Sequence, residues 1–294
     1  MGKSSKLQQS SIHILFIVLS IVVVLPFLLV IAVSLTDEKT LTAYGYQFIP
    51  RVFSADAYRY MFESPEVLLR AYGVTLLVTV AGTLSGLLVT AMTAYVVSRQ
   101  DYRYNRLTTF YVFFTMLFSG GLVPSYILIT QYLHLKDSLL ALILPVLLSP
   151  FNVIVMKGFL SKLPFEIVES AKIDGAREFN IFFRIILPLS TPALATLGLL
   201  ISFAYWNEWF NAMLYIDDPN KVPLQLLLVR TLNSIEFLTS NSEFSQQVGI
   251  DLADFPNNSA RMAIAVLAGG PMLVVFPFFQ RFFVKGLTVG SLKG

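Results

Sequence analysis

Cysteine is absent from the 294-residue chain, and charged residues make up only 13% of it. Without cysteine the protein has no disulfide framework, no thiol nucleophile and no cysteine-based metal site. Soluble domains carry about 25% charged residues, so this shortfall indicates a membrane protein. The formal net charge of +3 is too small to indicate nucleic-acid binding.

Histidine is almost absent too, since His13 and His134 are the only two. An intramembrane enzyme would need paired acids, a Ser–His set or metal ligands, whereas isolated histidines near the ends of apolar segments are typical of interfacial side chains. The opening Gly2-Lys3-Ser4 lacks the upstream glycine, strand and helix of a phosphate-binding loop. We therefore expect no catalytic residue, no metal site and no cofactor in this chain.

What the chain has instead is a series of long windows with hardly any charge. A bilayer core about 30 Å thick needs about 20 residues of helix. Six windows reach this length, the fifth broken only by Glu208: 12–35, 71–98, 107–133, 138–156, 185–215 and 262–280. The first is longer than the core of a signal peptide, so we expect an uncleaved span. The windows predict an all-α membrane protein with six transmembrane helices in a single domain, residues 1–294.

Basic residues predict the orientation, because they gather on the cytoplasmic side of membrane proteins. With the N-terminus inside, the cytoplasmic segments hold most of the 21 Lys and Arg: Lys3, Lys6, Arg99, Arg103, Arg106, Lys157, Lys162, Lys172, Arg177, Arg184, Arg281, Lys285 and Lys293. We therefore expect both termini in the cytoplasm and two long outer loops, 36–70 and 216–261. The apolar patch 224–229 of the second loop predicts a short interfacial helix. The pair Gly82 and Gly86 is typical of close helix packing.

The end of the fifth window combines aromatic, amide and acidic side chains. These are Tyr205, Trp206, Asn207, Glu208, Trp209 and Asn211. In a continuous helix Asn207, Glu208 and Asn211 would share one face. A carboxylate in a span faces protein or water, so this face is either a solute pathway or an anchor at the outer interface. Aromatic rings beside polar groups would suit a sugar.

The most charged stretch connects the fourth and fifth windows, over residues 157–184. Pro164 and Glu166 are typical of a helix start, and Gly175 fits the left-handed position that ends a helix. Composition alone leaves an ordinary amphipathic connector open, with local pairs such as Glu169 with Lys172.

The spacing of this stretch resembles the EAA loop of ABC importer permeases. Glu169-Ser170-Ala171, then Gly175 after three residues and Ile185-x-Leu187-Pro188 after nine more, match that loop in type and spacing, with Ser170 where alanine is usual. The tail from Gln280 to Gly290 is similar to that of carbohydrate-uptake permeases. Residues 120–124 and the Trp206-Asn207 region are similar to the branch that handles oligosaccharides and polysaccharide fragments.

The resemblance implies a type I ABC importer permease fold with a cytoplasmic coupling helix at about 164–175, seated by its apolar face in a partner ATPase. It assigns contacts with the ATPase to Glu169, Ser170, Ala171, Asp174, Gly175, Ala176, Leu187 and Pro188, and in the C-terminal tail to Arg281, Lys285 and Gly286. The partners it implies are a homologous second permease, two ATPase subunits that bind ATP and Mg, an extracytoplasmic solute-binding protein and a saccharide. The expected location is the cell membrane.

A secondary transporter or channel is the alternative class. It would need ionisable residues or broken helices near the middle of the membrane. Glu208 is the only such residue available, and it lies off-centre. The sequence does not name the sugar.

Overall fold

The computed structural model describes residues 6–241 and 256–288, and within them the side chains of 9–241 and 256–277. These residues are helical, apart from turns and one isolated bridge between Thr36 and Phe53. The chain divides into two compact units. Unit 1 comprises residues 1–68 and 228–271, and unit 2 comprises residues 69–227 and 272–294.

Unit 1 holds the first helix and the segments that follow it up to residue 68, together with residues 228–271. Its elements are α1 (Lys6–Ser34), α2 (Glu38–Tyr44), α3 (Asp56–Met61), most of α14 (Leu224–Ser240) and the first part of α16 (Asn257–Thr288). The helix predicted at 224–229 is therefore present but longer, because its apolar pattern continues through Leu228 and Ile235, which are both buried.

Glu38 is a nearly buried carboxylate in unit 1 that caps the start of α16. Its two oxygens accept four hydrogen bonds of 2.8–3.0 Å, from the backbone amides and side chains of Asn258 and Ser259. The first amides of a helix have no partner within the helix, and a negative charge is favourable at that end. Glu38 therefore fixes the start of α2 to the first turn of α16.

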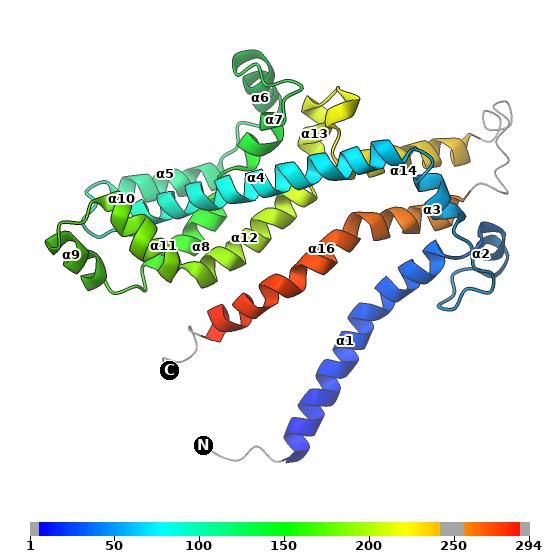
Figure 1. Ribbon diagram of the computed structural model, residues 1–294, viewed down its shortest axis with the longest axis horizontal. Helices are drawn as coiled ribbons and strands as arrows, with labels where there is room; N and C mark the ends of the chain where they lie inside the picture. The colour runs from blue at the N-terminus through cyan, green and yellow to red at the C-terminus, as the bar shows by residue number, and fades with distance from the viewer. Residues whose placement is uncertain (1–5, 242–255, 289–294) are drawn as a thin grey trace. The chain divides into compact units, whose positions relative to one another are not determined.

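Unit 2 contains the remaining elements. They are α4 (Pro65–Ser98), α5 (Asn105–Leu117), α6 (Leu122–Ile127), η1 (Leu128–Tyr132), α7 (Leu140–Ile143), η2 (Leu144–Val146), α8 (Pro150–Leu160), α9 (Glu166–Ile173), α10 (Glu178–Ile181), η3 (Phe182–Ile186), α11 (Leu187–Leu189), α12 (Thr191–Trp206), α13 (Phe210–Tyr215) and η4 (Pro219–Lys221). Figure 1 shows α9 and α10 together at one end of this unit.

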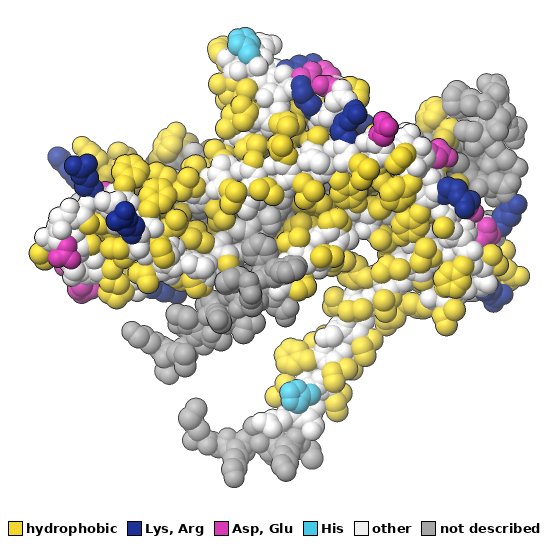
Figure 2. Space-filling model, viewed as in Figure 1, with side chains coloured by type: hydrophobic (Ala, Val, Ile, Leu, Met, Phe, Trp, Pro, Cys, Tyr) yellow, Lys and Arg dark blue, Asp and Glu magenta, His cyan; other side chains and the backbone are white. Residues whose placement is uncertain are grey.

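Three described helices are long and apolar enough to cross a membrane by themselves: Gln9–Ser34, Pro65–Ser98 and Asn257–Pro277. Three bent pairs bring the number to six if each pair is one span. They bend by 110° (Asn105–Leu117 with Leu122–Tyr132), 53° (Leu140–Val146 with Pro150–Leu160) and 81° (Glu178–Leu189 with Thr191–Trp206). Figure 2 shows hydrophobic side chains over most of the visible surface and charged ones in separate patches.

Glycines allow α4 and α12 of unit 2 to pack closely, as the sequence predicted. A Cβ on Gly82 would lie 2.5 Å from the ring of Tyr205, and one on Gly86 would lie 3.1 Å from the carbonyl oxygen of Leu147. The Tyr205 hydroxyl donates to the carbonyl oxygen of Ile143 at 2.9 Å. Since the hydrophobic effect does not drive helices together in lipid, such close contacts and buried hydrogen bonds hold the bundle together.

Candidate functional site

The helix α9 begins and ends where the residue types predict. Glu166 and Glu169 lie in its first turn, where a negative charge is favourable, and Lys172 lies in its last. Val168 and Ala171, three positions apart, face inward and are buried. Eight residues would be marginal as an isolated helix, so the packing of this face holds α9 in place.

Gly175 ends α9 in a Schellman motif. Its φ is +79°, in the left-handed region that favours glycine. The amide of Gly175 donates to the carbonyl of Lys172 at 3.0 Å, and the amide of Ala176 donates to that of Ala171 at 2.9 Å. This is the hydrogen-bond pattern of the motif, so the chain leaves the helix in one defined direction.

The apolar face of α9 packs against its own chain, which corrects one expectation. Val168 and Ala171 belong to a core cluster with residues of α4, α8 and η3. They are not available to a partner, so the idea that a partner buries this face is wrong. The outward face instead carries Glu166, Glu169, Ser170 and Ile173, of which Ile173 is 86% exposed.

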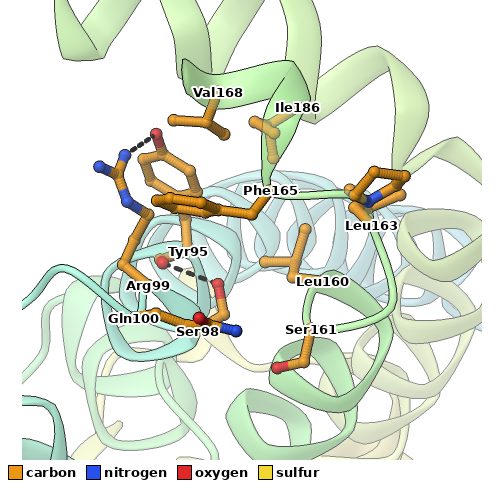
Figure 3. Close-up of a pocket in the computed structure, with 11 residues that line it drawn as sticks. Tyr95, Ser98, Arg99, Gln100, Leu160, Ser161, Leu163, Phe165, Val168 and Ile186 are labelled. Atoms are coloured by element: carbon orange, nitrogen blue, oxygen red, sulfur yellow. Dashed lines mark hydrogen bonds between the residues drawn. The ribbon is translucent and has the colours of Figure 1, made fainter. Parts of the chain in front are cut away.

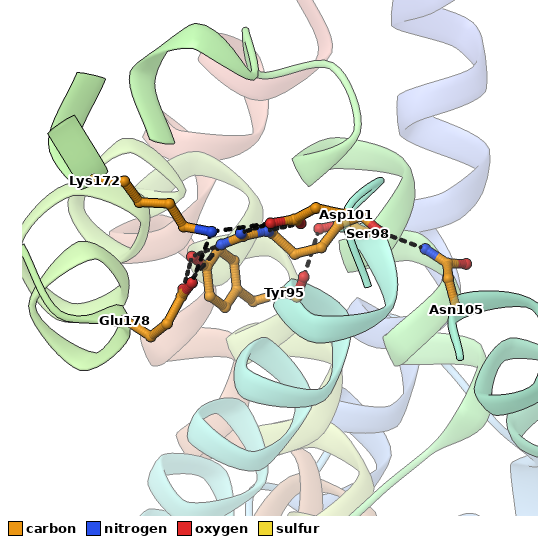
Figure 4. A network of polar contacts seen from close by, with 7 residues as sticks. Tyr95, Ser98, Asp101, Asn105, Lys172 and Glu178 are labelled. Carbon is orange, nitrogen blue, oxygen red and sulfur yellow. Dashed lines mark hydrogen bonds and ion pairs between the residues drawn. The ribbon is translucent and has the colours of Figure 1, made fainter. Parts of the chain in front are cut away.

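A network of polar side chains joins α9 and α10 to the end of α4. We call it the Arg99 network: Tyr95, Arg99, Asp101, Lys172 and Glu178. The Arg99 guanidinium donates to the Tyr95 hydroxyl at 2.7 Å, to Glu178 at 2.9 Å and to both oxygens of Asp101. Lys172 bridges Asp101 at 2.9 Å and Glu178 at 3.2 Å. Figure 4 shows Lys172 and Glu178 pointing toward Tyr95 and Asp101.

The network balances two cations with two carboxylates around a nearly buried arginine, whose side chain is 9% exposed. Hydrogen bonds donated by Arg99 hold the pKa of Asp101 well below its usual range, and the hydrogen bond that Lys172 donates to Asp101 raises the pKa of Lys172. Glu178 accepts a hydrogen bond from the Tyr95 hydroxyl at 2.9 Å and pairs with Lys172 and Arg99, which favours its charged form. All four groups are therefore held in their charged forms.

A cavity of about 170 Å³ lies behind α9. It is lined by Tyr95, Ser98, Arg99, Gln100, Leu160, Ser161, Leu163, Pro164, Phe165, Val168 and Ile186. Figure 3 shows Phe165 and Tyr95 side by side in this cavity, with Arg99 donating to the Tyr95 hydroxyl. The Arg99 guanidinium also lies 5.8 Å from the ring centre of Phe165, just before α9. The start of α9 thus rests on the same arginine that pairs with Glu178 beyond its end.

The sequence did not indicate the Arg99 network. Arg99 and Asp101 count there only as charges in a cytoplasmic turn, and Glu178 as a charge after the glycine. The pair of Lys172 with Glu169, left open as a local salt bridge, is not among the ion pairs of the described residues. One signal was available: Asp101 lies between Arg99 and Arg103, in a chain that otherwise avoids charge.

The other predicted contacts near the loop have mixed exposure. Asp174 and Gly175 are exposed, Ala176 is half-buried, Leu187 packs against the core cluster and Pro188 is exposed. The side chains of Arg281 and Lys285, and Gly286 with them, are in the last part of α16 and lie outside the described side chains.

The predicted shared face at the end of the fifth window is wrong, because the helix breaks there. The helix α12 ends at Trp206 and α13 starts at Phe210. Glu208 instead accepts a hydrogen bond from the backbone amide of Asn211 at 2.8 Å. Tyr205 and Trp206 are buried, whereas Asn207 and Trp209 are exposed and Glu208 and Asn211 are half-buried.

Apolar helices of membrane length, together with a surface helix that an ion network fixes, define a multi-pass membrane protein with a structured loop. The chain belongs to the family described as the binding-protein-dependent transport system inner membrane component, whose model matches residues 8–289. It is thus a permease subunit of an ABC importer and not an enzyme, since ATP hydrolysis in such importers lies in separate subunits. The family excludes the secondary transporter or channel.

Relatives cover nearly the whole chain. Protein LplC of Bacillus subtilis is 41% identical over 93% of this chain and 90% of its own length. The polygalacturonan/rhamnogalacturonan transport system permease protein YtcP of the same species is 40% identical over 94% of each chain. The arabinooligosaccharides transport system permease protein AraQ, also from that species, is 27% identical over 97% of this chain and 95% of its own.

A solved structure shows the same fold. One chain of a bacterial ABC transporter involved in the import of the acidic polysaccharide alginate matches with a TM-score of 0.78 and 25% identity, covering 96% of this chain and 99% of that one. The expected type I ABC importer permease fold is therefore confirmed.

Proposed function

We propose that this chain and a homologous second permease form the membrane pathway of an ABC importer for oligosaccharides or polysaccharide fragments. The names of the relatives support this cargo, since they refer to polygalacturonan, rhamnogalacturonan and arabinooligosaccharides. ATP and Mg bind to two partner ATPase subunits, and an extracytoplasmic solute-binding protein delivers the saccharide to the outer loops 36–70 and 216–261. Both termini of the chain lie in the cytoplasm.

One observation carries the coupling role: α9 is fixed at its C-terminal end and keeps a polar face exposed. The Arg99 network fixes the last turn through Lys172, and the Schellman motif at Gly175 fixes the exit. Glu169 and Ile173 are exposed on a helix whose opposite face is packed into the core cluster. An ATPase that receives this face transmits its movement directly to α4, α8 and α12, because they share one core cluster with α9.

The expected cycle is alternating access. ATP closes the ATPase dimer, the two coupling helices move toward each other, and the spans turn outward to accept the saccharide. The tail contacts assigned to Arg281, Lys285 and Gly286, and the solute-pathway role of Tyr205, Trp206, Asn207, Glu208, Trp209 and Asn211, are parts of this proposal.

Charge reversal at Glu169 tests the docking face. Glu169→Lys should lower the amount of ATPase that co-purifies with the permease by about tenfold. The lysine would face the ATPase groups that accommodate the glutamate, and a like-charge contact at a tight interface costs more than about 1.4 kcal/mol. Glu63→Lys is the matched control, since Glu63 is an exposed acid in the outer loop. Equal ATPase recovery with both variants would contradict the proposed face. The saccharides that stimulate the ATPase of the assembled complex would then identify the cargo.

A further inference from the structure

A second polar feature of unit 2 lies close to the Arg99 network but uses none of its side chains. A groove of about 320 Å³ runs between the start of α5 and α8, lined by Asn105, Arg106, Thr109, Phe110, Phe113 and Lys157. Nothing in the coupling role uses these side chains. They combine two cations with two phenyl rings, which indicates a ligand with an anionic and an apolar part.

The two cations of the groove have no acidic partner in the part of the chain that is described. Lys157 is half-buried, and its ammonium donates to the Thr109 hydroxyl at 2.9 Å. Neither Lys157 nor Arg106 takes part in an ion pair with another described residue. Arg99, the nearly buried cation of the same unit, has two carboxylates. A half-buried cation without a carboxylate favours an anion from outside the chain.

The groove is polar at one end and apolar at the other. Asn105, Thr109 and Phe113 are four residues apart and so share one face of α5, with Arg106 and Phe110 beside them. From Arg106 to Phe113 the helix rises by about 10 Å. The cations thus lie at the helix start, and the exposed phenyl rings lie further along the span. An ion without an apolar part would leave the rings unused.

The groove lies at the α9 end of its unit. The Asn105 amide donates to the carbonyl oxygen of Arg99 at 2.7 Å, and the Arg99 side chain pairs with Glu178. In the proposed orientation this end faces the cytoplasm. Anionic lipids give that leaflet a negative surface, and basic pockets between spans on that side bind lipid headgroups.

We propose that the groove binds an anionic phospholipid, with the phosphate between Arg106 and Lys157 and an acyl chain along Phe110 and Phe113. The α5 start adds the positive end of a 13-residue helix to the two cations. The lipid supplies the counter-charge that Lys157 lacks and covers the rings that α5 leaves exposed. This site is independent of the proposed cargo and of the docking face on α9.

Lipid binding can be measured on the whole importer in nanodiscs of phosphatidylcholine with added phosphatidylglycerol. The variant Arg106→Gln with Lys157→Gln should bind phosphatidylglycerol about 25-fold more weakly, at about fivefold for each cation removed. The control is Arg103→Gln with Lys162→Gln, which removes equal charge from two exposed positions of the same side that do not line the groove. The charge-preserving pair Arg106→Lys with Lys157→Arg should retain most of the binding.

Native mass spectrometry of the released complexes counts the bound lipids. Selective loss of phosphatidylglycerol in the groove variant supports the proposal. Equal loss in the control variant would mean nonspecific surface attraction and would overturn it, as would unchanged binding in the groove variant. Displacement of the lipid by millimolar inorganic phosphate would assign the site to a free phosphate, and the lipid assignment would then be wrong.

Discussion

Arg99 and Glu178 are 79 positions apart in the sequence, and their side chains pair at 2.9 Å. The arginine follows the last turn of α4, and the glutamate opens α10 just beyond the glycine that ends α9. The pair therefore attaches the segment that follows α9 to the end of α4. Without it, α9 would be a short helix between two loops. Removing the pair tests whether the coupling helix must be rigid.

Arg99→Ala should lower uptake by at least tenfold while the complex still assembles. The substitution removes the hydrogen bonds to Asp101, Glu178 and Tyr95, and we expect a stability loss of about 1–2 kcal/mol because both acids are partly exposed to water. Uptake and ATPase activity are measured together in proteoliposomes, so that ATP hydrolysis without transport is detected.

The matched control is Arg103→Ala. Arg103 is exposed in the same connection, and its guanidinium lies 5.7 Å from the ring centre of Tyr104. A double-mutant cycle with Glu178→Ala measures the pair itself. Additive losses from Arg99→Ala and Glu178→Ala would argue against a shared role, as would normal uptake in the first variant.

The cost of replacing Gly175 should follow how readily the new residue adopts a positive φ. A Cβ at this position would meet nothing within 4 Å, so any loss comes from the positive φ and not from a clash. We expect Gly175→Asn to be mild, Gly175→Ala to cost about 1 kcal/mol, and Gly175→Val to cost more and to uncouple transport.

Gly158→Ala is a matched control for that series. Gly158 lies in α8, also has nothing within 4 Å of a Cβ, and lacks the positive φ. Alanine should be neutral or slightly stabilising there, since it favours helix. Thermal unfolding of the complex and uptake rates check both positions. Normal uptake with Gly175→Val would exclude a rigid exit from α9.

Stability should not depend on the Arg99 network's ionisation between about pH 5 and pH 9. A lowered carboxyl pKa stabilises the fold above the ordinary value of 3.8 and loses this effect as the pH falls through the folded value. A raised lysine pKa stabilises below 10.5 and loses the effect as the pH rises further. Both effects are complete at neutral pH.

Asp101→Asn makes this measurable. The difference in unfolding free energy between the native complex and the variant should stay constant from about pH 5 to pH 9 and shrink only below about pH 4. Denaturation at a series of pH values gives this difference. A transition centred near pH 6 or 7 would show that another group controls the network.

Asn207, Glu208 and Asn211 surround the break between α12 and α13, where they can be tested as a solute pathway. Backbone outside a helix at membrane depth is tolerated where it lines a cavity or is buried in protein. Replacing all three by Ala should lower uptake about tenfold or more without loss of assembly. Uptake at several saccharide concentrations separates binding from turnover.

Glu208→Gln distinguishes the two roles that remain for this segment. Its side-chain oxygen can still accept from the Asn211 amide, as the glutamate does at 2.8 Å. If the glutamine variant transports normally while Glu208→Ala loses both stability and uptake, the side chain is a structural cap and not part of the pathway. Intact uptake in the triple variant would leave only an anchor at the interface.

Helix positions were predictable because uncharged windows of membrane length have few other solutions. The windows 12–35, 71–98 and 262–280 overlap helices that can each cross a membrane. The bends were harder to predict. The break before α6 depends on the positive φ of Gly121, and the break after Trp206 falls at Asn207 and Glu208, which a continuous helix also accommodates.

The candidate site was predictable in its local part only. Pro164, Glu166 and Gly175 indicated the ends of α9 because caps and helix ends depend on residues a few positions apart. The partners Arg99 and Asp101 could not be found in this way, since no spacing rule connects positions so far apart. The buried face of α9 was assigned to a partner because an apolar stripe does not say which surface covers it.

The first helix, α1, packs against the rest of its own chain only at its C-terminal end. Within the described side chains, the membrane-length window of α1 contains no buried residue, and burial begins only at Ala32, Val33 and Ser34, where the Ser34 hydroxyl meets that of Tyr58 at 2.9 Å. The chain's own packing therefore holds α1 by its last turn, and the rest of the helix is left for lipid or other subunits to contact. A new polar residue halfway along α1 should therefore leave the chain's own packing intact and report only on what lies around it.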